Sequence, residues 1–196
     1  MHWILPNAKF NLDTLDSAWF IPYSLPSLAP SRPELAPEED EEGMLKTVAY
    51  LDSIVHACVT AGVPPQRIVL GGFSQGCAMS LLWFLTTTRY SDKLGGIVGL
   101  LGFLPLSDGK HRIQELRAEA GFPATAPKVP MFLARGTKDS LIQPRIWRYT
   151  LQGLSDLGVA DENMEVHEYP GLEHTINGPL LRDMCAWLEQ RLPKIE

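Results

Sequence analysis

The stretch from residue 67 to residue 85 constrains the fold of this chain more than any other. It reads RIVLGGFSQGCAMSLLWFL: a short apolar run, then glycines around a serine, then a longer apolar run. The first run is typical of a buried parallel strand and the second, residues 75–87, of a buried helix. Because Gly72 and Gly76 stand two residues either side of Ser74, the backbone can reverse sharply there. The sequence therefore predicts a strand, a tight turn that carries a serine, and a helix.

Strand patterns and helix patterns alternate along most of the chain. We expect strands over residues 3–5, 67–70, 96–101, 129–134 and 164–169, and helices over 37–61, 75–87, 110–120, 144–157 and 178–192. Residues 9–37 are rich in proline and are expected to be an irregular loop. Strands that alternate with helices form a mostly parallel sheet with helices on both faces. We expect one α/β domain over residues 1–196, with 164–169 as an edge strand.

The composition is that of an ordinary globular protein. The chain has 196 residues, of which 45% are hydrophobic and 20% charged, and its formal net charge is −6. Because nucleic-acid binding needs a basic face, we expect no nucleic-acid partner. The acidic run at residues 38–42 is expected to lead into a helix, where carboxylates suit the positive end of the helix dipole.

The cysteines bear on compartment and metal binding. Cys58, Cys77 and Cys185 are too few and too scattered for a disulfide framework or a metal site. Reduced thiols are typical of the cytosol, and the first residues do not resemble a secretory signal. The longest apolar segment, 97–106, is too short to span a bilayer. We therefore expect a cytoplasmic protein without an integral membrane segment and without a bound metal.

Ser74 lies where the predicted strand meets the predicted helix. The residues from Gly72 to Gly76 match the pattern G-x-S-x-G in the strand-turn-helix context that the pattern requires. In parallel sheets, ligands bind at the carboxyl ends of the strands. The turn lifts the serine hydroxyl above the sheet, and the backbone N–H of Gln75 can donate to a developing oxyanion. This predicts a nucleophilic serine; the alternative is a glycine-rich turn with an incidental serine.

A serine hydroxyl is a poor nucleophile without a neighbouring base. His174 follows the last predicted strand, in the loop YPGLEHTINGP, from which its ring can reach Ser74. The alternative for His174 is an ordinary loop histidine. The other histidines are less well placed: His2 is terminal, His56 and His111 belong to predicted helices, and His167 lies within a predicted strand.

The acid that orients the histidine should follow an intervening strand. Asp139 does so, in FLARGTKDSLIQP, and the chain order serine, aspartate, histidine is the one that G-x-S-x-G enzymes use. Asp108 follows an earlier strand and is the weaker alternative. Asp156 and Asp161 lie near the far end of the following helix, on the wrong side of the sheet. We expect Asp139 to accept a hydrogen bond from His174 and to stabilise the imidazolium that forms during attack.

At these residues the chain resembles the acyl-protein thioesterase and phospholipase/carboxylesterase family of α/β-hydrolases. The segments that carry the resemblance run from about residue 4 to residue 193: ILPNA, SAWF, RIVLGGFSQGCAMSL, GLLGFLPL, RGTKDSLIQP and YPGLEHTI. The resemblance gives Ser74, Asp139 and His174 the same roles as the residues themselves suggest. It implies hydrolysis of fatty-acyl thioesters on protein cysteines, or of small carboxylic esters and lysophospholipids. It also implies a cytosolic location and no cofactor.

The chain departs from the family pattern at three places. Arg135 stands where the family usually has histidine, and Thr137 where it often has aspartate. The family also carries an early H-G-x-G-D segment that supplies a second oxyanion donor, and nothing before Gly43 resembles it. We therefore expect an N-terminally shortened α/β-hydrolase fold: either the sequence is a fragment, or it is a shortened member with a different second donor.

The sequence thus predicts a serine hydrolase acting on esters or thioesters with apolar acyl groups. Its substrate is expected to be an acylated protein or a small lipid or ester, and the chain to be a monomer or a homodimer. One alternative is a short-chain carboxylesterase; another is a catalytically impaired relative or fragment that acts as a binding module. Four apolar loop residues either line the acyl groove or fill the core beneath the loops: Leu104, Leu106, Leu141 and Ile142.

Overall fold

The main sheet has four parallel strands. The computed structural model describes residues 1–11, 16–22, 39–106, 111–122 and 126–192. Within these residues the strand order is β3-β4-β5-β6, with every neighbouring pair parallel. The strands are β3 (Val69–Phe73), β4 (Gly96–Leu100), β5 (Met131–Gly136) and β6 (Met164–Tyr169). The helices are α1 (Glu41–Thr60), α2 (Gln75–Thr86), α3 (Arg112–Glu119), α4 (Pro144–Asp156) and α5 (Gly178–Arg191).

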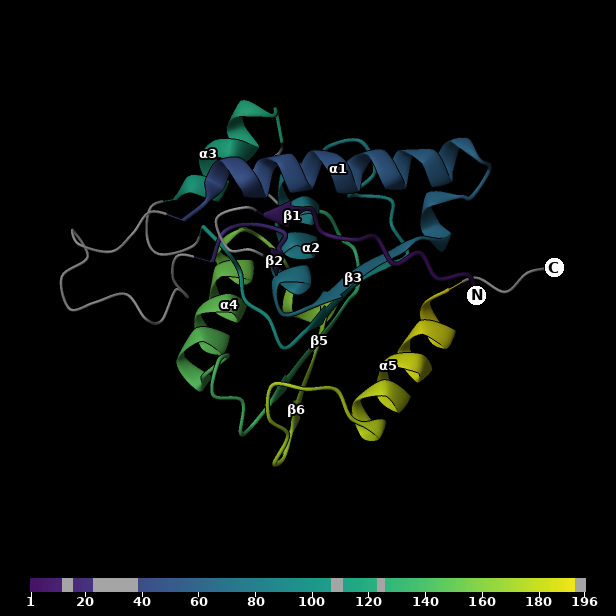
Figure 1. Cartoon of the computed structure of the whole chain (residues 1–196). Helices are drawn as coiled ribbons and strands as arrows, with labels where there is room; N and C mark the ends of the chain where they lie inside the picture. Colours follow the sequence, from purple (N-terminus) through teal and green to yellow (C-terminus); the bar gives the residue numbers. More distant parts are fainter. Residues whose placement is uncertain (12–15, 23–38, 107–110, 123–125, 193–196) are drawn as a thin grey trace.

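Helices cover both faces of this sheet (Figure 1). α1 to α4 contribute to one core cluster, and α5 packs against the other face in a second cluster. β5 serves both: Met131 and Leu133 belong to the first cluster, Phe132 and Ala134 to the second. A strand buried on both faces reads as a continuous apolar run, which is how this segment appears in the sequence. The expected mostly parallel α/β architecture is therefore confirmed.

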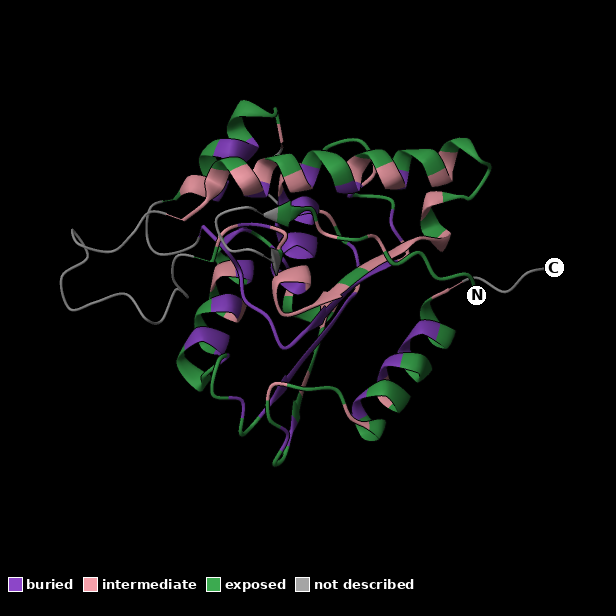
Figure 2. Cartoon of the chain, in the orientation of Figure 1, coloured by how far each residue is buried: buried purple, intermediate pink, exposed green. Residues whose placement is uncertain are grey.

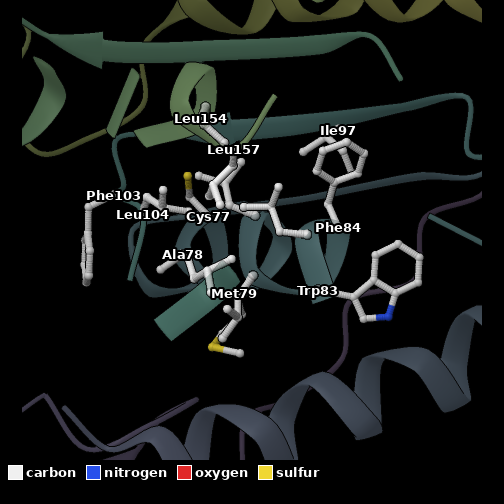
Figure 3. Close-up of a cluster of buried hydrophobic side chains, with 14 of the residues drawn as sticks. Cys77, Ala78, Met79, Trp83, Phe84, Ile97, Phe103, Leu104, Leu154 and Leu157 are labelled. Carbon is white, nitrogen blue, oxygen red and sulfur yellow. The ribbon is translucent and has the colours of Figure 1, made fainter. Parts of the chain in front are cut away.

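α2 is the central helix of the larger cluster. All its residues from Cys77 to Leu85 are buried, whereas α1 and α5 carry exposed residues on their outer sides (Figure 2). Figure 3 shows Met79 and Phe84 of α2 in the same cluster as Ile97 of β4 and Leu154 of α4. A helix that is apolar all round is stable only when other elements surround it. The burial of α2 fixes the helix whose first turn begins at the motif serine.

The predicted helices and most predicted strands are confirmed, with shifts at their ends. β3 begins two residues later than expected because Pro65–Arg67 forms a 3-10 turn. The side chain of Asn177 caps α5 by accepting a hydrogen bond from the Leu180 N–H at 3.0 Å. β6 is an edge strand, as predicted. No helix in the described part of the chain has the length and apolar content that crossing a bilayer requires.

The strand predicted over residues 3–5 is wrong. Trp3, Ile4 and Leu5 are 63%, 60% and 82% exposed and belong to no strand. A strand needs a hydrogen-bonded neighbour and a face to bury, and this apolar triplet has neither. The Pro-rich segment predicted to be irregular instead contains a short antiparallel pair, β1 (Phe10–Asn11) with β2 (Asp16–Ser17). Its residues 12–15 and 23–37 lie outside the described residues.

The turn between β3 and α2 is too tight for a side chain at Gly72. Ser74 has φ 54°, in the left-handed region, and a Cβ at Gly72 would lie 2.2 Å from the carbonyl carbon of Gly76. No real Cβ contact is that short, so the turn requires glycine at this position. Glycine at position 72 is therefore a packing requirement of the fold, whereas a Cβ at Gly76 would meet no atom closer than 4.0 Å.

We expect Gly72→Ala to lower the free energy of unfolding by about 1–3 kcal/mol, because the added methyl group forces β3 and α2 apart. Urea unfolding followed by circular dichroism measures the change. Gly178→Ala is the matched control, since nothing lies within 4 Å of a Cβ there. An equal stability for Gly72→Ala and Gly178→Ala would contradict this account of the turn.

Candidate active site

Three side chains from three loops meet at the carboxyl edge of the sheet. Ser74 follows β3, Asp139 follows β5, and His174 follows β6. His174 Nε2 lies 3.0 Å from Ser74 Oγ, and His174 Nδ1 lies 2.8 Å from Asp139 Oδ2. The structure thus brings together all three residues that the sequence predicts to act together. Each contact is within hydrogen-bond range for a nucleophile, a base and an orienting acid.

The backbone around Ser74 explains why its hydroxyl is available. Ser74 is the N-cap residue of α2, but its side chain makes no capping hydrogen bond. Its own N–H donates to the Leu100 carbonyl at 2.9 Å, which joins the turn to the end of β4. Gln75, the predicted oxyanion donor, is the first residue of α2. Because backbone N–H groups in a first helical turn have no carbonyl partner within the helix, this amide can receive an anion.

Asp139 is held in one orientation by its own loop. It is only 4% exposed. Its Oδ1 accepts hydrogen bonds from the backbone N–H groups of Leu141 and Ile142, both at 2.8 Å. Its Oδ2 therefore faces His174, and an ionised carboxylate can only accept there. It follows that Nδ1 of a neutral His174 carries the proton and that Nε2 is free to accept one from Ser74.

The histidine loop is fastened to the acid loop by hydrogen bonds. The N–H of Thr137 donates to Tyr169 O at 3.0 Å, and the N–H of Lys138 donates to Leu172 O at 2.9 Å. The Gly171 N–H donates to Thr137 Oγ1 at 2.8 Å. Thr137, one of the departures from the family pattern, thus has a structural partner in the histidine loop. These bonds set the distance between Asp139 and His174.

Phe73 is a neighbour of the site that the sequence prediction missed. Its ring centroid lies 4.8 Å from that of His174, with the planes tilted by 46°. Phe73 also packs against the smaller core cluster, so it supports the imidazole from the body of the domain. Phe73 occupies the variable position just before the motif serine. That position is the one sequence signal that could have marked Phe73 as a neighbour of the site.

Arg135 pairs with a carboxylate on the neighbouring strand. Its Nε and Nη2 donate to the two carboxylate oxygens of Glu168 on β6, at 3.2 and 3.4 Å. Arg135 is 4% exposed, and this ion pair spans neighbouring strands of the sheet. The substitution of arginine for the family's histidine is accommodated by the acidic partner on β6.

The four predicted acyl-groove residues separate into two groups. Leu104, Leu106 and Ile142 are 1%, 6% and 1% exposed and belong to the core cluster. These three side chains are buried among core side chains and offer no surface to a ligand. They fill the core beneath the loops, which is the second of the two roles considered for them. Leu141, beside Asp139, is 47% exposed. It is the one of the four that could touch an acyl chain.

The remaining candidates for base and acid lie away from Ser74. His56 contacts the Tyr90 hydroxyl, His111 is the N-cap residue of α3, and His167 contacts Glu165 on the same strand. Asp156 ends α4, and Asp161 begins the turn before β6. Asp108 lies outside the described residues. Across residues 1–11, 16–22, 39–106, 111–122 and 126–192, no three His, Cys, Asp or Glu side chains gather in a way that could hold a metal ion.

Cys77 lies one turn of helix beyond Ser74 and is the nearest thiol in sequence to the motif. It is 2% exposed and belongs to the larger core cluster. Burial raises the pKa of its thiol to about 12. A thiol with so high a pKa stays protonated at neutral pH and is a weak nucleophile. Cys77 therefore does not compete with Ser74 as the nucleophile of the site.

Comparison with known proteins decides the family. The phospholipase/carboxylesterase family matches residues 1–192, nearly the whole chain. The chain belongs to this family. Among curated proteins, acyl-protein thioesterase 1 of Yarrowia lipolytica is 38% identical over 161 residues, covering 79% of this chain and 63% of that protein. Acyl-protein thioesterase 1 of Cryptococcus neoformans var. neoformans serotype D is 32% identical over 205 residues, covering 97% of this chain and 79% of that protein.

Solved structures of similar proteins agree with the fold. Arabidopsis thaliana SOBER1 superposes with a TM-score of 0.77 at 27% identity, covering 96% of this chain and 83% of that one. Acyl-protein thioesterase 2 of Zea mays superposes with a TM-score of 0.71 at 24% identity, covering 97% and 81%. The expected α/β-hydrolase-type fold is thereby confirmed. The chain spans less than two thirds of the Yarrowia protein and about four fifths of the Cryptococcus protein.

We expect iodoacetamide to leave Cys77 unmodified in the native protein at pH 7–8, because its thiol is buried and protonated. Cys185 is exposed on α5 and serves as the internal positive control. Peptide mass spectrometry after timed quenching measures alkylation at each site, and urea-unfolded protein should react at all positions. Alkylation of Cys77 at the rate of Cys185 in the folded protein would show that the thiol beneath the motif is accessible.

Proposed function

We propose that this chain is a serine hydrolase that cleaves carboxylic esters or thioesters with apolar acyl groups. The observation that carries the proposal is the hydrogen-bonded line from Asp139 through His174 to Ser74, with contacts of 2.8 and 3.0 Å. Such a line converts a weakly nucleophilic hydroxyl into an attacking group, because the imidazole takes the proton as the new bond forms.

In the first half-reaction, Ser74 Oγ attacks the acyl carbon while its proton moves to His174 Nε2. The imidazolium that results is stabilised by the carboxylate of Asp139 across the 2.8 Å contact. The carbonyl oxygen becomes an oxyanion, which the Gln75 N–H is placed to receive at the start of α2. The tetrahedral species then collapses, and the alcohol or thiol leaves with the proton from His174.

In the second half-reaction, water replaces the leaving group. His174 accepts a proton from water, which attacks the acyl-serine, and a second oxyanion forms at the same position. Collapse returns the proton to Ser74 and releases the carboxylic acid. The same three side chains therefore serve both steps, and neither step consumes a cofactor.

The names of the relatives favour acylated proteins as substrates. Both the Yarrowia and the Cryptococcus proteins are acyl-protein thioesterases, so removal of fatty acyl groups from protein cysteines is the first candidate reaction. Small lipid esters such as lysophospholipids are further candidates. A cytosolic location, where reduced thiols and acylated cytosolic proteins occur together, is part of the same proposal.

Short-chain carboxylic esters form a second candidate substrate class. The observation in favour is that Leu104, Leu106 and Ile142 are enclosed in the core, which leaves the exposed Leu141 alone among the predicted groove residues. Rates on acetyl and palmitoyl esters of the same leaving group separate the two classes. A higher kcat/KM on the palmitoyl ester supports long-chain acyl substrates, and a higher kcat/KM on the acetyl ester supports short-chain esters.

We expect Ser74→Ala to abolish labelling by a fluorophosphonate probe and to lower kcat on an activated ester by on the order of 10⁶-fold, because no other group supplies the nucleophile. In-gel fluorescence and mass spectrometry of the labelled peptide measure the result. Ser53→Ala, on the exposed side of α1, is the matched control and should label like the wild type. Labelling that persists in Ser74→Ala would reject Ser74 as the nucleophile, and a wild type that does not label would favour a non-catalytic binding role.

A further inference from the structure

The first turn of α2 lacks the usual anchor of a helix N-terminus. Helices are commonly fixed there by an N-cap side chain that accepts a hydrogen bond from a backbone N–H of the first turn. The N-cap of α2 is Ser74, which makes no such bond; its hydroxyl contacts His174 instead. The turn that presents the Gln75 N–H thus needs another means of holding its position.

The side chain of Gln75 makes two hydrogen bonds to a distant segment. Its Oε1 accepts from the Trp19 N–H at 3.2 Å, and its Nε2 donates to the Phe20 carbonyl at 3.4 Å. Both ends of the side-chain amide are therefore used, on consecutive residues of one strip of backbone. The indole of Trp19 lies beside the same turn, since a Cβ at Gly76 would be 4.0 Å from Trp19 Nε1.

The segment that Gln75 holds is itself fastened to α1. Thr47 Oγ1 donates to the Trp19 carbonyl at 2.5 Å, and the Ile21 N–H donates to Asp40 Oδ2 at 2.7 Å. The other oxygen of Asp40 caps α1 by accepting from the Gly43 N–H at 3.0 Å. The backbone around Trp19 is thus a bridge between the start of α1 and the start of α2.

Burial adds to these hydrogen bonds. Phe20 is 5% exposed, and its ring meets that of Phe103 edge to face at 6.4 Å. Phe103 follows β4 in the loop whose Gly102 lies against Ser74, since a Cβ at Gly102 would be 2.7 Å from the Ser74 carbonyl. The segment is therefore a fixed support for the first turn of α2 on both its polar and its apolar sides.

We propose that the side chain of Gln75 is a positioning group for catalysis: by binding the backbone of Trp19 and Phe20 it holds the first turn of α2, and with it the Gln75 N–H, in the orientation that receives the oxyanion. The inference rests on the proposed hydrolase function. Gln75 then has two separate parts in the reaction, a backbone donor that touches the substrate and a side chain that aims this donor.

A loosened donor weakens binding of the transition state more than binding of the substrate. An interaction made in the transition state alone lowers kcat when it is lost and leaves KM almost unchanged. Gln75→Met keeps the backbone N–H and the length of the side chain and removes both hydrogen-bonding groups. Loss of hydrogen bonds of ordinary strength predicts a decrease in kcat of about 10-fold.

The experiment compares Gln75→Met with wild type on an activated ester, with enzyme concentration set by active-site titration. We expect kcat to fall about 10-fold, KM to change by less than about two-fold, and the pH dependence of kcat/KM to keep its midpoint, since His174 is untouched. Gln152→Met is the matched control: Gln152 makes an exposed hydrogen bond to Asp156 within α4 and should retain wild-type kinetics.

Thr47→Val is the second variant, which cuts the support from the α1 side without touching α2. Thr47→Val should lower kcat by a smaller factor than Gln75→Met. If Gln75→Met does not fold, the kcat of Thr47→Val tests whether the segment around Trp19 positions the first turn of α2. A wild type that hydrolyses and labels normally, with a folded Gln75→Met of unchanged kcat, would overturn this inference and leave the hydrolase intact. A Gln75→Met variant in which only KM rises and kcat stays unchanged would also overturn it. A wild type that neither labels nor hydrolyses would instead contradict the proposed hydrolase function.

Discussion

The crossing of the histidine loop over Gly136 is the contact on which the rest of the site depends. A Cβ at Gly136 would lie 2.1 Å from the Leu172 carbonyl oxygen, so the loop rests directly on the backbone at the end of β5. That close approach lets His174 Nδ1 reach Asp139 while its Nε2 faces Ser74. A side chain at this position would lift the loop and break the line of hydrogen bonds, whatever residues stood in it.

A parallel sheet supplies the rest of the geometry with few additional contacts. Because β3, β5 and β6 run in the same direction, the loops that follow them emerge at one edge. The burial of α2 from Cys77 to Leu85 fixes the base of the serine turn, and the Phe73 ring contacts the imidazole of His174. The site is thus held by the core of the domain on one side and by loop-to-loop hydrogen bonds on the other.

The sequence was sufficient for those parts of the site that local pattern and chain order determine. Gly72 predicts the sharp turn because only a residue without a side chain fits there. The order of Ser74, Asp139 and His174, each after a different strand, predicts their meeting. Pairings such as Gln75 with Trp19 could not be predicted, since they join residues 56 positions apart and arise only when the helices have packed. Apolar character alone also failed to separate core from surface: Leu104 is enclosed, whereas the triplet Trp3-Ile4-Leu5 is exposed and forms no strand.

The departures from the family pattern near the acid loop show how neighbours adjust to a changed residue. Arg135 finds Glu168 on β6, and Thr137 fastens the loop through its hydroxyl to Gly171. Neither residue enters the line of hydrogen bonds between Asp139 and Ser74. The line of hydrogen bonds from Asp139 through His174 to Ser74 therefore does not depend on the identity of these two neighbours.

Trapping of the acyl-enzyme tests the central claim most directly. The protein is mixed with a slowly hydrolysed p-nitrophenyl ester, quenched in acid within one turnover, digested and sequenced by mass spectrometry. The account predicts a burst of nitrophenol stoichiometric with enzyme, with the acyl mass on the peptide that contains Ser74 and specifically on that serine. Steady hydrolysis without a burst and without acylated Ser74, or an acyl group found on a cysteine instead, would contradict it.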